Sequence, residues 1–183
     1  VQAKAGTISL QKLGIIDAAD EESTGSDLPD IAETDGAAPY AASNGDLVVA
    51  IDAGHGGTDG GATYDGMQEK TLNLKIAKYL KTYLEEYAGV QVYLTRSTDT
   101  YLDLSERVKR SVANNADVFI SIHNNASSNL ETSGSMVFYP NSSYRPSLSK
   151  EGKGLSTAIL GKLTALGLPD LGVRTRDSET GNT

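Results

Sequence analysis

Hydrophobic residues along this chain follow the periods of alternating strands and helices. Continuous apolar runs at 48–53 and 118–122 are typical of buried parallel strands, and alternation over 90–94 predicts another strand. Apolar residues at three- and four-residue steps predict a helix that begins at Glu69 and is ended by Gly89. The apolar stripe of this helix contains Leu72, Ile76, Tyr79, Leu80, Tyr83, Leu84 and Tyr87. Because a strand, a helix and a strand follow in order, the two strands should pair in parallel.

A second helix is expected to begin after Asp103. Asp103 and Glu106 have the spacing of a capping box, and Val108 and Val112 should form a short buried face. The strand that follows, 118–122, is apolar on both faces, which is typical of a central strand covered by helices on either side.

The last third of the chain continues this alternation. A strand is expected at 135–139, followed by a helix whose apolar residues run from Leu155 to Leu166 before Gly167 ends it. Residues 172–183 are expected to form a polar loop. Together the elements predict an α/β fold, with a mixed, mostly parallel sheet flanked by helices on both faces in a three-layer sandwich.

The region before the first strand has a different composition. Residues 17–46 are acidic, rich in Ala, Ser and Gly, and contain two prolines and few apolar residues, so they are expected to form a linker. Residues 1–16 contain a short apolar segment, which is either a flank of the following domain or the end of a preceding one. Residues 47–183 are then one domain of ordinary size.

Charge and composition exclude several classes of function. The net charge is −8, yet residues 48–183 hold fifteen acids and fourteen bases, so no basic face is expected for nucleic acid. No apolar run is long enough to span a bilayer. The absence of cysteine excludes disulfides and thiolate metal ligands, and suits an exported protein.

Both histidines of the chain follow apolar strands, and this is the strongest chemical signal. A lone histidine after a strand is usually structural, but residues past the carboxyl ends of parallel strands line the ligand crevice, so His55 and His123 could face one site. Glu69 is the candidate third ligand, because it begins a helix whose dipole favours a carboxylate. Two histidines and a glutamate leave one coordination position open, as catalytic zinc sites do. We therefore expect one zinc ion.

The loop after the first strand holds further candidates. It is rich in glycine but lacks the Lys and Ser/Thr of a phosphate-binding P-loop. Asp52 and Asp59 are candidates to orient a ligand histidine through its second nitrogen, although turn stabilisation explains them equally well. Asn125, two residues beyond His123, is a candidate for lining the cleft.

Four motifs occur in the order IDAGHGG, GMQEKTLNL, VYLTRSTD and LSERVKRSVANNADVFISIHNNAS. From Val48 onward the chain thereby resembles the zinc-dependent N-acetylmuramoyl-L-alanine amidases of the amidase-3 group. The resemblance implies hydrolysis of the amide bond between N-acetylmuramic acid and L-alanine in peptidoglycan, and an extracellular or cell-wall location. Arg96 lies in a motif of the form TR-x-x-D, for which the resemblance implies a role at the cleft; a salt bridge that fastens the loop is the simpler physical explanation.

The end of the chain departs from the family pattern. Members carry a further strand with a catalytic glutamate, and no segment within residues 1–183 matches it, so the catalytic residue stays unassigned and the domain is expected to lack this strand. Two alternatives remain open. A zinc peptidase would need a charged group to fix a peptide terminus, for which Arg96, Arg174 and Arg176 are the candidates, and a non-catalytic wall-binding metal module would need no glutamate. The sequence does not fix an oligomeric state.

Overall fold

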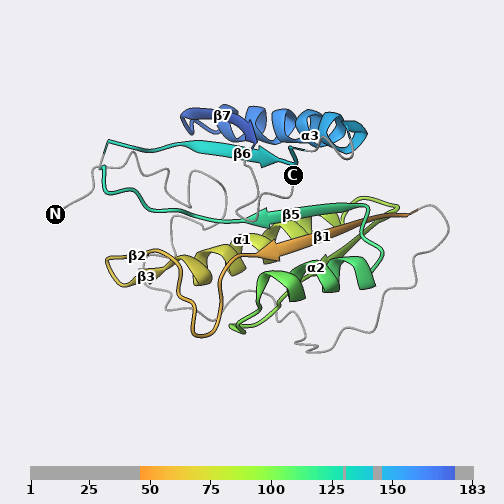
Figure 1. Cartoon of the computed structure of the whole chain (residues 1–183), viewed down its shortest axis with the longest axis horizontal. Coiled ribbons are helices and arrows are strands. Elements are labelled where there is room, and N and C mark those ends of the chain that lie inside the picture. The colour runs from red at the N-terminus through yellow and green to blue at the C-terminus, as the bar shows by residue number, and fades with distance from the viewer. Residues whose placement is uncertain (1–45, 130, 142–145, 176–183) are drawn as a thin grey trace. The chain divides into compact units, whose positions relative to one another are not determined.

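The computed structural model describes residues 46–129, 131–141 and 146–175 (Figure 1). Its contacts divide the chain into two compact units, with the boundary between Ala126 and Ser127. We refer to residues 46–126 as the first unit and to the described residues from 127 onward as the second unit. The expectations for residues 1–16 and for the linker up to residue 45 fall outside the described residues.

A parallel sheet forms the centre of the first unit. Its strands are β1 (Leu47–Ala53), β4 (Val90–Leu94) and β5 (Val118–Ile122), in the order β4-β1-β5. Both pairings are parallel, as predicted. The strand expected at the centre, β5, lies at an edge of this three-stranded sheet, and β1 is the central strand, which is why residues 48–53 are all buried.

Helix α1 (Glu69–Leu84) covers one face of this sheet. The core on this side is built from alternate strand residues and from one line of the helix, and comprises Val49, Ile51, Ala53, Ala77 and Val92. The tyrosines of the expected stripe do not all belong to it, since Tyr83 and Tyr87 are 58% and 67% exposed. The fully buried helix residues are instead Asn73 and Ala77, whose small side chains allow the helix to approach the strands closely.

Helix α2 (Leu104–Ala113) covers the other face. The Asp103 carboxylate accepts a hydrogen bond of 2.8 Å from the backbone N–H of Glu106, so the predicted N-cap is present. The expected apolar buried face is wrong, because Val108 and Val112 are 57% and 70% exposed. Figure 1 shows α1 and α2 on opposite sides of β1, which confirms the predicted arrangement of helices on both faces of a mostly parallel sheet.

The charge on β1 explains why α2 turns a polar side inward. Asp52 lies on the face of β1 opposite the α1 core, and its carboxylate is 2.7 Å from Nη1 of the buried Arg107. A buried carboxylate without a partner would be strongly destabilising. The helix therefore directs Arg107 and Ser111 toward the sheet, and its valines face solvent.

A short hairpin precedes α1. It consists of β2 (Thr63–Tyr64) and β3 (Met67–Gln68), which pair antiparallel. Both residues of its turn, Asp65 and Gly66, have positive φ angles of 48° and 77°, as two-residue hairpin turns require. The hairpin leads directly into Glu69.

The second unit contains β6 (Ser135–Tyr139), α3 (Pro146–Ala165) and β7 (Asp170–Thr175). The two strands pair in parallel and α3 packs on them, and Gly167 follows the helix with a φ of 91°, as expected. The polar loop expected from residue 172 is wrong in part, because 172–175 belong to β7. Gly172, with a φ of 95°, interrupts the alternation by which the strand could have been recognised.

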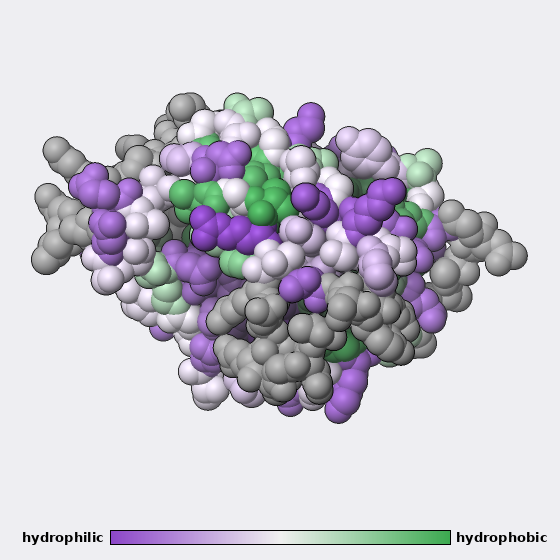
Figure 2. Space-filling model, turned by 45° about the horizontal axis from the view of Figure 1, so that its top comes forward, coloured by the Kyte–Doolittle hydropathy of each residue, from purple (hydrophilic) through white to green (hydrophobic). Residues whose placement is uncertain are grey.

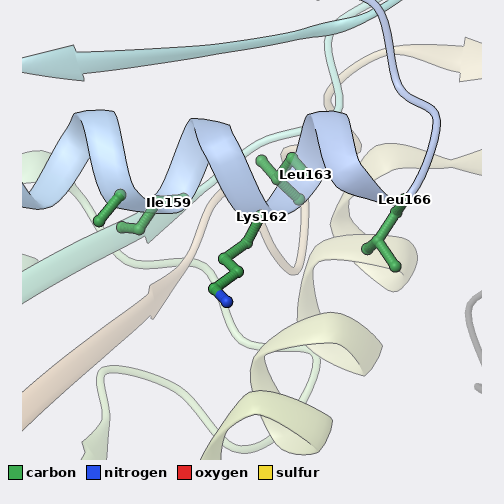
Figure 3. A pocket seen from close by; sticks show the side chains of 5 residues that line it. Ile159, Lys162, Leu163 and Leu166 are labelled. Carbon is green, nitrogen blue, oxygen red and sulfur yellow. The ribbon is translucent and has the colours of Figure 1, made fainter.

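Helix α3 also carries an exposed apolar side. Its exposed apolar residues include Leu148 and Leu155, and the exposed Leu166 directly follows it. Figure 2 shows that hydrophobic side chains gather on the surface in the upper half of that view. A shallow depression of about 310 Å³ on the helix is lined by Ala158, Ile159, Lys162, Leu163 and Leu166 (Figure 3), and contains no candidate ligand. Among the described helices, none combines the length and the apolar character that crossing a bilayer demands.

Candidate metal centre

Three elements of the first unit bring the predicted ligands together. His55 lies in the loop after β1, Glu69 is the first residue of α1, and His123 follows β5. One ligand atom from each residue lies within 4.8 Å of the other two, and the imidazole rings are 4.9 Å apart between centroids at an interplanar angle of 82°. The carboxyl ends of adjacent parallel strands thus converge as the strand order implies.

Glu69 is the central residue of the cluster. Its side chain is 3% exposed, and the carboxylate accepts backbone hydrogen bonds of 2.9 Å from Ala62 on Oε2 and from Asn124 on Oε1. Its Oε2 lies 3.3 Å from Nε2 of His55, and its Oε1 lies 3.1 Å from Nδ1 of His123. Burial raises the pKa of this carboxyl group. The hydrogen bonds from Ala62, Asn124 and Asn73, together with the nearby His55, outweigh burial and hold the pKa below its ordinary value. Glu69 is therefore an anion at neutral pH.

A second carboxylate fixes the His55 ring. Oδ2 of Asp59 lies 2.8 Å from Nδ1 of His55, and Oδ1 accepts a hydrogen bond from the backbone N–H of Gly61. The hydrogen bond with His55 lowers the pKa of Asp59, which keeps it ionised. Because an ionised carboxylate only accepts hydrogen bonds, Nδ1 of His55 donates to Asp59, and Nε2, which faces Glu69, is the nitrogen left to bind a metal ion.

This donor set fits a metal ion. Nε2 of His55 and an anionic oxygen of Glu69 lie 3.3 Å apart, and each can donate a lone pair to a cation bound between them. The Asp59 carboxylate behind the His55 ring is the outer-shell partner that metal-binding histidines generally have. Two imidazoles and one carboxylate, without sulfur, suit zinc with an open coordination position.

Two glycines leave the space in which the ligand side chains lie. A Cβ atom on Gly54 would stand 2.3 Å from Cε1 of the His123 ring. A Cβ atom on Gly61 would stand 2.6 Å from Cδ2 of His55 and 2.8 Å from Oε2 of Glu69, and this residue has a φ of 64°. Glycine is thus required at Gly54 for space, and at Gly61 for both space and backbone conformation.

Arg96 has a different role from the one its motif suggested. It is 3% exposed, and its guanidinium donates four hydrogen bonds, all to backbone carbonyls, at Ala53, Gly54, Lys70 and Thr98. The ion pair that fastens the loop joins Lys70 to Asp99 at 2.6 Å, and Asp99 also accepts from the N–H of Gly57. The salt bridge expected for Arg96 is therefore wrong, because within the described residues the cation that pairs with Asp99 is Lys70.

The other candidates from the sequence lie apart from the ligands. Asp52 binds Thr95, Arg107 and Ser121 on the α2 side of the sheet, and it contacts neither histidine ring. Asn125 is exposed, and no hydrogen bond within the described residues joins it to the cluster. Arg174 belongs to β7 in the second unit, and Arg176 falls outside the described residues.

Two asparagines of the site, Asn73 and Asn124, were not among the residues predicted from the sequence. The fully buried Asn73 donates to the carbonyl of Gly54 at 3.1 Å, and Asn124 donates to the side-chain oxygen of Asn73 at 2.8 Å. Asn73 follows Glu69 by four residues, so the two share one face of α1. A polar residue on the helix face that also carries the candidate ligand was the signal that could have identified Asn73.

Comparison with known proteins gives an independent view of this site. Residues 49–181 match the model of the Amidase_3 family, described as N-acetylmuramoyl-L-alanine amidase. This range includes His55, Glu69 and His123 together with all elements of the described fold after the start of β1.

Named relatives agree with the family match. The chain is 42% identical over 126 residues to N-acetylmuramoyl-L-alanine amidase LytC of Bacillus subtilis, an alignment that covers 68% of this chain and 24% of LytC. It is 37% identical over 134 residues to the endolysin of Bacillus phage SPP1, covering 71% of this chain and 48% of the endolysin. The chain thus spans half or less of the length of these curated relatives.

A solved structure also matches. The catalytic domain of CwlV, an N-acetylmuramoyl-L-alanine amidase from Bacillus (Paenibacillus) polymyxa var. colistinus, superposes with a TM-score of 0.62 at 35% sequence identity. The match covers 72% of this chain and 71% of that domain.

Proposed function

The chain belongs to the N-acetylmuramoyl-L-alanine amidase family, and from that premise we propose that it hydrolyses the amide bond between N-acetylmuramic acid and L-alanine in bacterial peptidoglycan, using zinc held by His55, Glu69 and His123. The single observation that carries the proposal is the convergence of these three side chains, within 4.8 Å, inside the range that matches the family. Substrate and bond are those named for the relatives.

The protein's own residues prepare the site for a cation. Glu69 supplies a buried negative charge, and Asp59 holds His55 in the tautomer whose Nε2 is free to bind. When bound, zinc would supply a Lewis acid that polarises the scissile carbonyl and lowers the pKa of water. Within the described residues, the carboxylates that contact the ligand histidines are Asp59 and Glu69. Both are engaged in holding the site, so we assign proton transfer to a group other than these two.

The burial of Arg96 weighs against a zinc peptidase. Fixing a peptide carboxylate requires a guanidinium with N–H groups directed to the cleft. Four hydrogen bonds of Arg96 go to backbone carbonyls instead. A non-catalytic metal module is the other alternative, and the activity assay below separates it from an enzyme. We place the site of action at the cell wall, where the proposed substrate lies.

The test is a digest of purified peptidoglycan with the full-length protein. We expect new amino termini of L-alanine while the glycan chains stay uncleaved. Chelation should abolish the release of these amino termini, and added zinc should restore it. Glu69→Gln should lose zinc and activity together, because the site then lacks its negative charge. Glu85→Gln is the matched control, since Glu85 lies just beyond the other end of α1 and pairs only with Lys81 among the described ion pairs.

Three outcomes would contradict the proposal. Equal activity of Glu69→Gln and the wild type would remove Glu69 from the site. Cleavage within the peptide stem, or of peptides without a muramyl group at the same rate, would indicate a peptidase. Zinc binding without any release of amino termini would favour the non-catalytic module.

A further inference from the structure

The loop that carries His55 rests on two buried arginines from different elements. We infer that Arg96 and Arg107 are positioning residues, which hold the backbone on both sides of His55 and thereby aim its imidazole at Glu69. The inference rests on the proposed metal site. Arg96 follows β4 and Arg107 lies on α2, so two residues that are distant from His55 in sequence determine the geometry of this ligand.

The two guanidinium groups bind three successive carbonyls. The Ala53 carbonyl accepts from Nε of Arg96 and from Nη1 of Arg107, each at 2.8 Å. The Gly54 carbonyl accepts from Nη2 of Arg96 at 3.0 Å, and the His55 carbonyl accepts from Nη2 of Arg107 at 2.9 Å. Every carbonyl from the end of β1 to the ligand itself is thus fixed by an arginine.

These contacts fix both backbone angles of His55. The Gly54 carbonyl belongs to the peptide plane before the His55 Cα, and the His55 carbonyl belongs to the plane after it. Holding both planes determines φ and ψ, and hence the direction of the Cα–Cβ bond. His55 needs this support because its φ of 62° lies in the left-handed region, which is unfavourable for a residue other than glycine.

At these buried positions a guanidinium group suits the loop carbonyls better than the amine of a lysine. Arg96 and Arg107 are 3% and 5% exposed. Of these two arginines, only Arg107 forms an ion pair within the described residues, and its partner is Asp52. Burial lowers the pKa of Arg96, as does the neighbouring charge of Arg107, yet a guanidinium stays protonated under such conditions. A lysine has one donor nitrogen and cannot reach several carbonyls in the same fixed geometry.

The same contacts exclude a substrate-binding role. Besides the loop carbonyls, Arg96 donates to Thr98 and Lys70, and Arg107 donates to Asp52 and to the carbonyl of Leu102. The two side chains are therefore committed to the protein itself. An effect of their replacement on the metal site would have to pass through the loop.

The experiment measures zinc affinity in Arg96→Lys and Arg107→Lys by competition with a chromophoric chelator. We expect each variant to bind zinc about 10- to 100-fold more weakly, the range found for outer-shell partners of metal ligands. When cobalt replaces zinc, the visible spectrum of each arginine variant should differ from that of the cobalt-loaded wild type. Arg110→Lys is the matched control: Arg110 lies one turn further along α2 and also donates to a carbonyl, that of Thr95, but does not contact the loop.

A thermodynamic cycle isolates the route through His55. In a His55→Ala background, Arg96→Lys should no longer change the residual affinity for zinc. The chain has only two histidines, so the imidazole NMR signals of metal-free protein can be assigned, and the His55 signals should move in the arginine variants. If Arg107→Lys does not fold, Arg107→Met combined with Asp52→Asn removes the pair without leaving an uncompensated buried charge.

The outcomes separate this inference from the proposed function. A wild-type protein that binds no zinc would overturn the metal site. A wild type that binds zinc, with arginine variants of equal affinity and unchanged His55 signals, would overturn only the positioning role. Equal losses with and without His55 would also overturn it.

Discussion

Replacing Gly54 by alanine should remove His123 from the metal site without unfolding the protein. The added Cβ would lie 2.3 Å from Cε1 and 2.4 Å from Nε2 of the His123 ring. Carbon atoms in contact stay about 3.5 Å apart, so the ring must retreat by about 1.2 Å. Zinc sites accept deviations of about 0.2 Å in ligand distance, so a displacement of this size removes the ligand.

The fold should tolerate the change. Gly54 does not occupy the left-handed region, so alanine fits its backbone, and the His123 side chain is 41% exposed and has room to move. We expect zinc affinity to fall by at least about 100-fold, since losing a ligand exceeds the effect of losing an outer-shell partner. Titration with zinc against a competing chelator measures the affinity, and thermal unfolding of metal-free protein checks the fold.

The control for this experiment is Gly161→Ala. Gly161 lies in α3, and a Cβ atom there would meet no atom within 4 Å. Its zinc affinity should equal that of the wild type. Unchanged affinity in Gly54→Ala would refute the reasoning, because the His123 ring could then not lie over Gly54 in the metal-bound protein.

Three further predictions concern the stability of the domain. Val108→Ser and Val112→Ser should each lower the free energy of unfolding by less than about 0.5 kcal/mol, because both side chains are mostly exposed; a larger loss in chemical denaturation would show that α2 packs by its valines. The N–H of Glu106 lowers the pKa of Asp103 from 3.8, so the stability that this charge provides is complete above about pH 3.8 and is lost as the pH falls through the lower native pKa. The difference in unfolding free energy between the wild type and Asp103→Asn should therefore shrink on acidification, and a constant difference between pH 6 and pH 2 would contradict the cap. Deleting residues 17–45 should leave the melting temperature almost unchanged, since their composition is that of a linker; a clear decrease would show that they pack on the domain.

The sequence predicted the parts of the fold that follow from strand order and hydrophobic period. The strands β1, β4 and β5 are continuous or alternating apolar runs, and parallel strands bring residues at their carboxyl ends together. The sequence alone therefore predicted that His55 and His123 lie at one site. Glu69 could be predicted for the same reason, because it begins the helix that connects the sheet strands β1 and β4.

Hydrophobic patterns failed where a polar contact determines the packing. The valines of α2 suggested a buried face, but the ion pair between Asp52 and Arg107 turns the helix the other way. The contacts of Arg96 with backbone carbonyls leave no trace in a sequence, since a carbonyl is the same at every residue. Asn124 donates its backbone N–H to Glu69 and its side-chain amide to Asn73, and the residue type alone indicates neither contact.

The central claim is that His55, Glu69 and His123 together hold one catalytic zinc ion. The most direct measurement is crystallography of the zinc-loaded protein, with anomalous scattering recorded on both sides of the zinc absorption edge. We predict a single strong peak in the first unit, with a nitrogen of each histidine and an oxygen of Glu69 at about 2.0–2.2 Å. A peak that lacks any of these three ligands, or no peak in protein shown to release L-alanine amino termini from peptidoglycan, would contradict the account.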